Sequence, residues 1–191
     1  IWDAAHSTLV ATVGATELLS SLRILSEIAQ QSETTTALWT EAQDALTSSA
    51  KATRPEVRRA AVQVMARLLA GGTETTTQVL GVMVELSKQA SVKEALWSEA
   101  RQALLRLASE PERELSKPAL RVLGELAKQS DYRHGLWTEA RQVLMARAAS
   151  EQPDVRSLSI SLLANLAADI SSGLNSYASE LLVALEQQPL A

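Results

Sequence analysis

The chain contains no cysteine, and this absence removes a whole group of possible chemistries. Disulfide bonds, thiolate nucleophiles and cysteine-ligated metal sites are all excluded, because each of them needs a sulfhydryl side chain. A cysteine-free chain fits a reducing compartment, so we expect a cytoplasmic protein.

Phenylalanine is also absent, and aromatic residues make up only 3% of the 191 residues. Either an alanine- and leucine-rich helical array fills its core without large rings, or the sequence is engineered. No apolar run approaches the roughly 18 residues that a membrane-spanning helix needs, and no signal-peptide pattern is present. The net charge of −4, with both signs interleaved, argues against a nucleic-acid partner.

A seven-residue phrase recurs along the chain. It first reads Leu22-Arg23-Ile24-Leu25-Ser26-Glu27-Ile28 and returns at 62–68, 80–86, 120–126 and 160–166. The central apolar residue moves by 40 positions from Leu25 to Met65, and again by 40 from Leu123 to Leu163. A fixed period of this size is typical of a solenoid built from helical hairpins.

A second phrase accompanies the first at a constant offset. Leu38-Trp39-Thr40-Glu41-Ala42 returns at 96–100 and 136–140, and each tryptophan follows the central residue of the first phrase by 14 positions. Tyr177 stands at the same offset after Leu163 and is interpreted as a degenerate terminal copy. Two phrases at one fixed offset indicate a true repeat.

The period is interrupted once. Met65 and Leu123 are 58 residues apart, which is one period of 40 plus 18 residues. The extra stretch holds its own copy of the recurring phrase, centred on Met83. We therefore expect an inserted helix, and locally irregular stacking, near 73–90.

The apolar spacing of three and four residues predicts helices throughout, and no strand pattern is present. We start one helix near Ser116 because Pro118 disfavours a helix interior, and we expect a left-handed helix end at Gly71-Gly72. The predicted fold is all-α: a right-handed α-solenoid of stacked antiparallel hairpins, four to five repeats, forming one array over 1–191 that is a fragment of a longer one. The expected helices are 4–12, 15–31, 34–49, 54–70, 74–90, 92–108, 115–129, 132–149, 153–170 and 174–187.

The starts of two predicted helices resemble a known family. Pro55-Glu56-Val57-Arg58 and Pro153-Asp154-Val155-Arg156 resemble the start of the second helix in HEAT repeats, which are armadillo-like. The third unit departs from this pattern, because Ser116 stands where the arginine is expected. A narrower resemblance, over Leu22 to Leu80, is to the N-terminal helical region of tuberin-like proteins.

The sequence shows no group of residues with the spacing that catalysis or cofactor binding needs. His6 and His134 each lack a second ligand at helical spacing, and Gly71-Gly72 lacks the lysine of a phosphate-binding loop. The repeated glutamates are equivalent residues of successive units rather than a paired acid and base. We therefore expect no metal, no cofactor and no enzymatic activity.

Two surfaces are candidates for binding. Trp39, Trp97 and Trp137 could form a ladder that grips a peptide, although their fixed position in each unit favours a buried role between hairpins. The second helix of HEAT hairpins usually lines the concave face, and the corresponding helices here carry basic residues diluted by glutamates. These candidate contact residues are Arg23, Arg59, Lys88, Lys117, Arg121 and Lys128.

The sequence thus predicts a scaffold that binds a protein or peptide along a helical face. One alternative is an engineered or purely structural repeat protein without a natural ligand. Another is a segment of a large tuberin-like regulatory scaffold.

Overall fold

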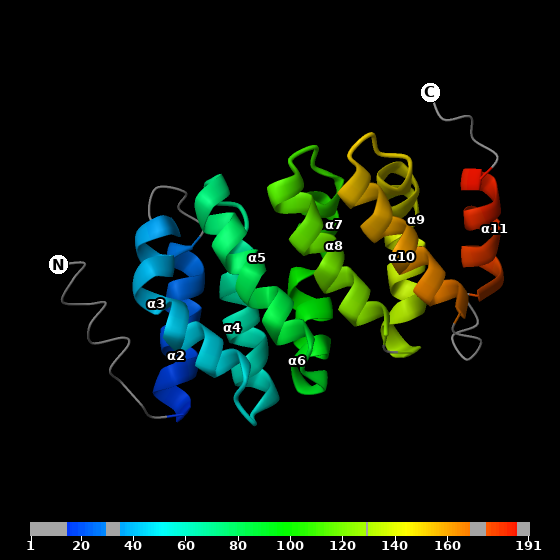
Figure 1. The fold of residues 1–191 in the computed structure, drawn as a ribbon. Coiled ribbons are helices and arrows are strands. Elements are labelled where there is room, and N and C mark those ends of the chain that lie inside the picture. Colours follow the sequence, from blue (N-terminus) through cyan, green and yellow to red (C-terminus); the bar gives the residue numbers. More distant parts are fainter. Residues whose placement is uncertain (1–14, 30–34, 129, 169–174, 187–191) are drawn as a thin grey trace. The chain divides into compact units, whose positions relative to one another are not determined.

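The computed structural model describes residues 15–29, 35–128, 130–168 and 175–186, and all regular structure within them is helical (Figure 1). The helix expected at 4–12 lies outside this part of the chain. Two compact units are present, residues 1–103 and residues 104–191. Each unit is described by itself, so a single array over the whole chain, and its handedness, stay predictions.

The described residues of the first unit form five helical stretches. Its helices are α2 (Ala15–Ile28), α3 (Thr35–Ala50), α4 (Pro55–Leu68), α5 (Thr73–Ser87), and α6 (Ala90–Ala95), which runs through the π-helical turn η2 (Leu96–Ala100) into α7 (Arg101–Ser109). The boundary between the units falls inside α7. The second unit contains α8 (Arg113–Ala127), α9 (Ser130–Ala148), α10 (Pro153–Ala168) and α11 (Asn175–Glu186).

Helices in each unit alternate between two rows. In the first unit α4 packs against α2 and against η2, which makes one row, while α3 packs against α5 in the other row (Figure 1). In the second unit α8 packs against α10, and α9 packs against α11. Neighbours in sequence, such as α3 with α4 and α9 with α10, pack as hairpins between the rows. The all-α fold of stacked hairpins is therefore confirmed.

The recurring phrase supplies the core of both units. Its central residues, Leu25, Met65, Met83, Leu123 and Leu163, are at most 4% exposed. Burial of one apolar side chain at the same place in each helix stabilises the fold through removal of nonpolar surface from water. The predicted side-chain register is therefore confirmed.

The extra helix of the interrupted period is α5, and it combines features of both rows. Its start, Glu74-Thr75-Thr76-Thr77, repeats the Glu-Thr-Thr-Thr of residues 33–36 that leads into α3, 41 positions earlier. The buried residues follow the same offset: Leu38 and Trp39 in α3 correspond to Val79 and Leu80 in α5, all at most 1% exposed. Its second half carries the recurring phrase of the other row. Thus α5 packs beside α3 as the next member of that row.

Two threonine hydroxyls join the matching helix starts. Thr36 Oγ1 lies 2.8 Å from Thr75 Oγ1, so one hydroxyl donates a hydrogen bond to the other between α3 and α5. Thr35, Thr75 and Thr76 are at most 2% exposed. The threonine runs therefore fix the two helices of one row at their N-terminal ends.

The prediction that α8 starts near Ser116 is wrong. The helix begins at Arg113, because the carbonyl of Glu112 accepts hydrogen bonds from the backbone N–H groups of Leu115 (3.1 Å) and Ser116 (2.9 Å). Pro118 therefore lies inside α8, where its ring nitrogen cannot donate to the carbonyl of Glu114. The lost bond is a single one in the second turn, and the fixed φ of proline is compatible with a helix.

The expected left-handed helix end at Gly71-Gly72 is also wrong, since neither glycine has a positive φ. Gly71 is needed for space instead. A Cβ atom at Gly71 would lie 2.8 Å from Thr35 Oγ1 and 3.1 Å from the carbonyl oxygen of Leu68. The missing side chain thus lets the connection between α4 and α5 approach the start of α3.

We expect Gly71→Ala to destabilise the first unit by about 1–3 kcal/mol, because a buried short threonine must shift to admit the methyl group. The matched control is Gly81→Ala, inside α5, where an added Cβ meets nothing within 4 Å. That variant should gain about 0.5–1 kcal/mol, since alanine is the better helix former. Urea denaturation of both variants measures the difference, and equal stabilities would refute the close approach at Gly71.

Candidate interaction surfaces

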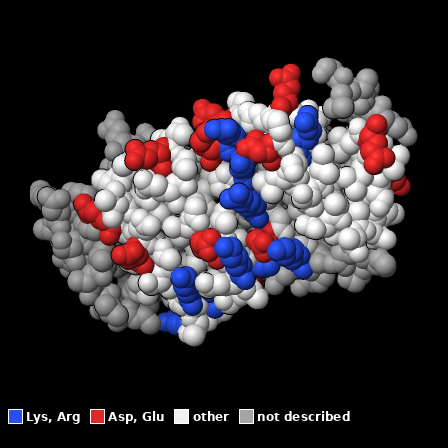
Figure 2. Space-filling model, viewed as in Figure 1, with Lys and Arg blue, Asp and Glu red and all other residues white. Residues whose placement is uncertain are grey.

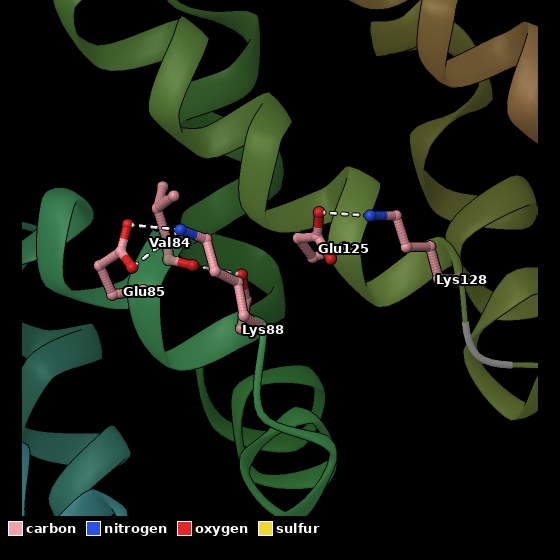
Figure 3. Close-up of polar contacts among 6 residues, drawn as sticks. Val84, Glu85, Lys88, Glu125 and Lys128 are labelled. Carbon is pink, nitrogen blue, oxygen red and sulfur yellow. Dashed lines mark hydrogen bonds and ion pairs between the residues drawn. The ribbon is translucent and has the colours of Figure 1, made fainter.

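Four of the six basic residues predicted to face a partner are engaged in ion pairs within their own unit. Arg59 pairs with Glu94, and Lys117 Nζ lies 2.6 Å from Asp154 Oδ2. Lys88 Nζ lies 2.7 Å from Glu85 Oε1 in α5, and Lys128 Nζ lies 2.6 Å from Glu125 Oε1 in α8, each within one helix (Figure 3). Figure 2 shows the same mixture, with acidic side chains next to basic ones.

The remaining two, Arg23 in α2 and Arg121 in α8, are exposed and form no ion pair with any described residue. They belong to different units, so the structure does not place these two positive charges on one continuous basic surface. A continuous basic face stays a prediction.

Acidic residues at three helix starts have lowered pKa values. The pKa of Glu56 in α4 and that of Glu114 in α8 fall because their own backbone N–H groups donate to the carboxylates, with help from Arg54 and Arg113. The pKa of Asp154 in α10 falls chiefly because Lys117 donates a hydrogen bond to it. These groups stay ionised at neutral pH, whereas a general acid or base needs a pKa near 7.

The Lys117–Asp154 pair joins α8 to α10 and should give the second unit a specific acid sensitivity. Because its folded-state pKa lies below the ordinary 3.8, Asp154 stabilises the fold above that value, and this contribution is lost as the pH falls through the lowered pKa. We expect Lys117→Met to lower stability at neutral pH and much less at pH values below the carboxyl range.

The matched control is Arg121→Met, at an exposed position of the same helix with no carboxylate partner among the described residues. Urea denaturation at neutral and acidic pH gives the two differences. A loss for Lys117→Met that is the same at both pH values would mean that the ion pair contributes nothing.

The three tryptophans differ in burial. Trp39 is 1% exposed, and its Nε1 has no hydrogen-bond partner among the described residues, which confirms the buried role. Trp97 and Trp137 are only half-buried. For these two residues the role of a plug between hairpins stays a prediction.

Each half-buried tryptophan carries an arginine over its ring. Arg101 Cζ lies 5.6 Å from the ring centroid of Trp97, and Arg141 Cζ lies 5.9 Å from that of Trp137. The arginine follows its tryptophan by four residues, the spacing that places two side chains on one helix face. We call these two constellations the Trp–Arg pairs. Contacts of this kind contribute about 0.5–1 kcal/mol at exposed positions.

The second Trp–Arg pair is extended by a tyrosine. The ring centroids of Trp137 and Tyr177 are 6.0 Å apart, with the planes tilted by 35°. Tyr177 is 52% exposed, so α9 and α11 together present an aromatic surface with a guanidinium group at its side. The prediction of Tyr177 as the terminal copy of the tryptophan position agrees with this arrangement.

The backbone beneath the first Trp–Arg pair is a π-helical turn, Leu96–Ala100, whereas the nearly identical Leu136-Trp137-Thr138-Glu139-Ala140 is regular α-helix. The local sequence therefore does not decide between the two conformations. The π-helical turn packs directly against α4, so tertiary contacts accompany the change. Such turns occur often at functional positions.

Metal and membrane contacts find no support in the described part of the chain. No group of three or more His, Asp or Glu side chains could hold a metal ion there. His6 lies outside the described residues, and so does the side chain of His134. None of the described helices combines the length and apolarity needed to cross a bilayer.

No protein-family profile and no curated protein matches the chain, so the resemblance to tuberin-like proteins gains no support there. Solved structures do match. Computationally designed armadillo repeat proteins for modular peptide recognition share 19% identity, with 94% of this chain and 98% of that chain covered and a TM-score of 0.41. A designed armadillo repeat protein in complex with the peptide (KR)4 shares 22% identity, with 96% and 90% covered and a TM-score of 0.44.

An engineered protein shares 20% identity, with 96% of this chain and 91% of that chain covered and a TM-score of 0.43. Two of these three matches are described as armadillo repeat proteins. At TM-scores below 0.5, this likeness supports no conclusion about function.

Proposed function

We propose that this chain is a non-enzymatic scaffold that binds a protein or peptide, and that the Trp–Arg pairs belong to its contact surface. The observation that carries the proposal is the presence of the same half-buried tryptophan with its arginine in both units. Trp97 and Trp137 are 40 residues apart, which is one repeat period.

The residue types at these pairs are those that dominate binding energy in protein interfaces. Tryptophan, tyrosine and arginine are enriched among interface hot spots, because they offer a large apolar area together with a polar group. At the second pair, Trp137 and Tyr177 offer ring area from two helices, while the exposed Arg141 offers hydrogen-bond donors. A partner could therefore pack an apolar side chain on the rings and place an acceptor at the guanidinium group.

The absence of catalysis is part of the proposal. All acidic groups whose pKa values are resolved as shifted among the described residues are shifted downward, toward permanent ionisation. Catalytic carboxylates are usually shifted the other way, by burial or by a neighbouring like charge. These three carboxylates thus behave as helix-start and ion-pair residues.

Arg23 and Arg121 support a second candidate surface, the basic face. They are exposed, and neither forms an ion pair with a described residue. On this alternative the partner is acidic and binds through charge rather than through the aromatic rings. The two candidates predict different sensitive residues, so one experiment can distinguish them.

The experiment is selection of a displayed random peptide library on the immobilised full chain, followed by affinity measurements with the enriched peptides. The matched variants are Arg141→Gln and Arg121→Gln, since both arginines are exposed and lie in the second unit. We expect Arg141→Gln to weaken binding by about tenfold, which corresponds to about 1.4 kcal/mol, and Arg121→Gln to leave it unchanged.

The reverse pattern would replace the Trp–Arg pairs by the basic face as the contact surface. If no peptide binds the folded chain better than the heat-unfolded chain, the scaffold proposal itself fails. Melting curves of both variants show that any loss of binding is not a loss of folding.

A further inference from the structure

The helix formed by α6, η2 and α7 buries its side chains in an order that a regular α-helix would not produce. Residues of an α-helix advance by about 100° each, so residues about 18 positions apart point in the same direction. Ala90 and Ala108 have this separation, yet Ala90 is exposed and Ala108 is fully buried. In a regular α-helix Ala95 and Arg106 would point within about 20° of each other, yet Ala95 is buried and Arg106 is exposed.

Regular helices of the same chain show no such conflict. In α8 the buried side chains from Leu115 to Ala127 fall within an arc of about 160°, and the exposed Glu114 and Arg121 lie outside it. Buried and exposed side chains also separate cleanly in α3, α4, α5 and α10. The conflict is therefore a property of the helix that carries Trp97.

The π-helical turn at Leu96–Ala100 removes the conflict. A π-helix closes its hydrogen bonds over one residue more than an α-helix, so one such turn sets back the direction of all following residues by about 100°. With this change all exposed residues between Ala90 and Ser109 fall on one side of the helix, and the buried ones fall on the other.

Buried side chains on both sides of the turn account for its presence. Val92, Lys93 and Ala95 of α6 are at most 6% exposed, and Leu104 and Ala108 of α7 are fully buried. We infer that η2 is a register correction, a turn that takes up one surplus residue so that α6 and α7 bury the same face of their common helix. This inference is independent of the proposed function.

A register correction determines where the helix can lose a residue. Deletion of one residue within η2 should turn the π-helical turn into an α-helical one and leave the directions of α6 and α7 unchanged. The same deletion in the regular helix α9 rotates its two parts by about 100° relative to each other. Leu136 and Leu144, both fully buried, could then no longer share one face.

The test compares deletion of Ser98 with deletion of Thr138, followed by thermal melting with circular dichroism. Both residues are exposed and directly follow a tryptophan in the same phrase, so they are matched. We expect the chain without Ser98 to melt cooperatively within about 5 °C of the unmodified chain. Deletion of Thr138 should lower the midpoint by more than about 10 °C or abolish the transition.

Ser98→Ala controls for the hydrogen bonds that the hydroxyl group makes with Ala95 and Glu99, and it should melt like the unmodified chain. An unfolded Ser98 deletion, with Ser98→Ala folded, would overturn the inference. Equal tolerance of both deletions would also overturn it, because the phrase would then accept a deletion in either conformation. Backbone nuclear magnetic resonance of the folded Ser98 deletion should show a regular α-helix there, and a persisting π-helical turn would contradict the inference.

Discussion

Replacement of Trp39 by alanine is expected to lower the free energy of unfolding by about 3–5 kcal/mol, the usual loss for a large aromatic side chain in a core. The indole is 1% exposed, so its removal opens a cavity that the surrounding helices can fill only in part. Urea denaturation with far-ultraviolet circular dichroism measures the loss.

Two companion variants make this prediction specific. Trp39→Phe should be much less damaging, because Nε1 donates no hydrogen bond to any described residue and none is lost. Trp137→Ala should cost less than Trp39→Ala, since Trp137 is only half-buried. Equal losses at Trp39 and Trp137 would show that the two indoles have the same surroundings, contrary to the structure.

The second large effect is expected at the centre of the recurring phrase in α8. Leu123 is fully buried, and Leu123→Ala should lower the free energy of unfolding by about 2–5 kcal/mol. Val183→Ala, at a side chain that is 51% exposed, is the control and should change stability by less than about half a kcal/mol. A small loss at Leu123 would mean that the repeated register of the helices is wrong.

The helices could be predicted well because the apolar stripe of each helix depends only on residues three and four positions apart in the sequence. The central residue of the phrase is buried in every described helix that carries the phrase, namely α2, α4, α5, α8 and α10. Proline was harder to place. The rule against proline in a helix interior moved the expected start of α8, yet one missing hydrogen bond beside the buried residues Leu115, Ala119 and Leu120 is too small a cost to stop the helix.

The ion pairs show where sequence information ends. Lys88 with Glu85 and Lys128 with Glu125 are three residues apart in one helix, so these pairs are visible in the sequence. Glu94 and Asp154 approach Arg59 and Lys117 from other helices, at separations of 35 and 37 residues. Only the packing of those helices brings the charges together, and this removes two cations from the predicted basic face.

The Trp–Arg pairs were readable in part. The spacing of four residues places Arg101 with Trp97 and Arg141 with Trp137 in any helix. The sequence cannot show that these two tryptophans are only partly buried while Trp39 is fully buried, because the local phrase is nearly the same in all three. The difference arises from tertiary packing and not from the local phrase.

The helix α5 begins like α3 but carries the recurring phrase in its second half, and its position affects the burial of Trp97. Because α5 takes the place beside α3, the helix that carries Trp97 joins the row of α2 and α4, although its sequence matches α3. Excision of residues 73–90 would restore an unbroken spacing of 40 and leave the Trp97 helix to follow α4 directly. That helix would then pack beside α3, in the place that α5 now holds. We expect the fluorescence maximum of Trp97 to move to the shorter wavelength that is typical of a buried indole. We therefore expect the solvent exposure of Trp97 to depend on a segment upstream of its own helix.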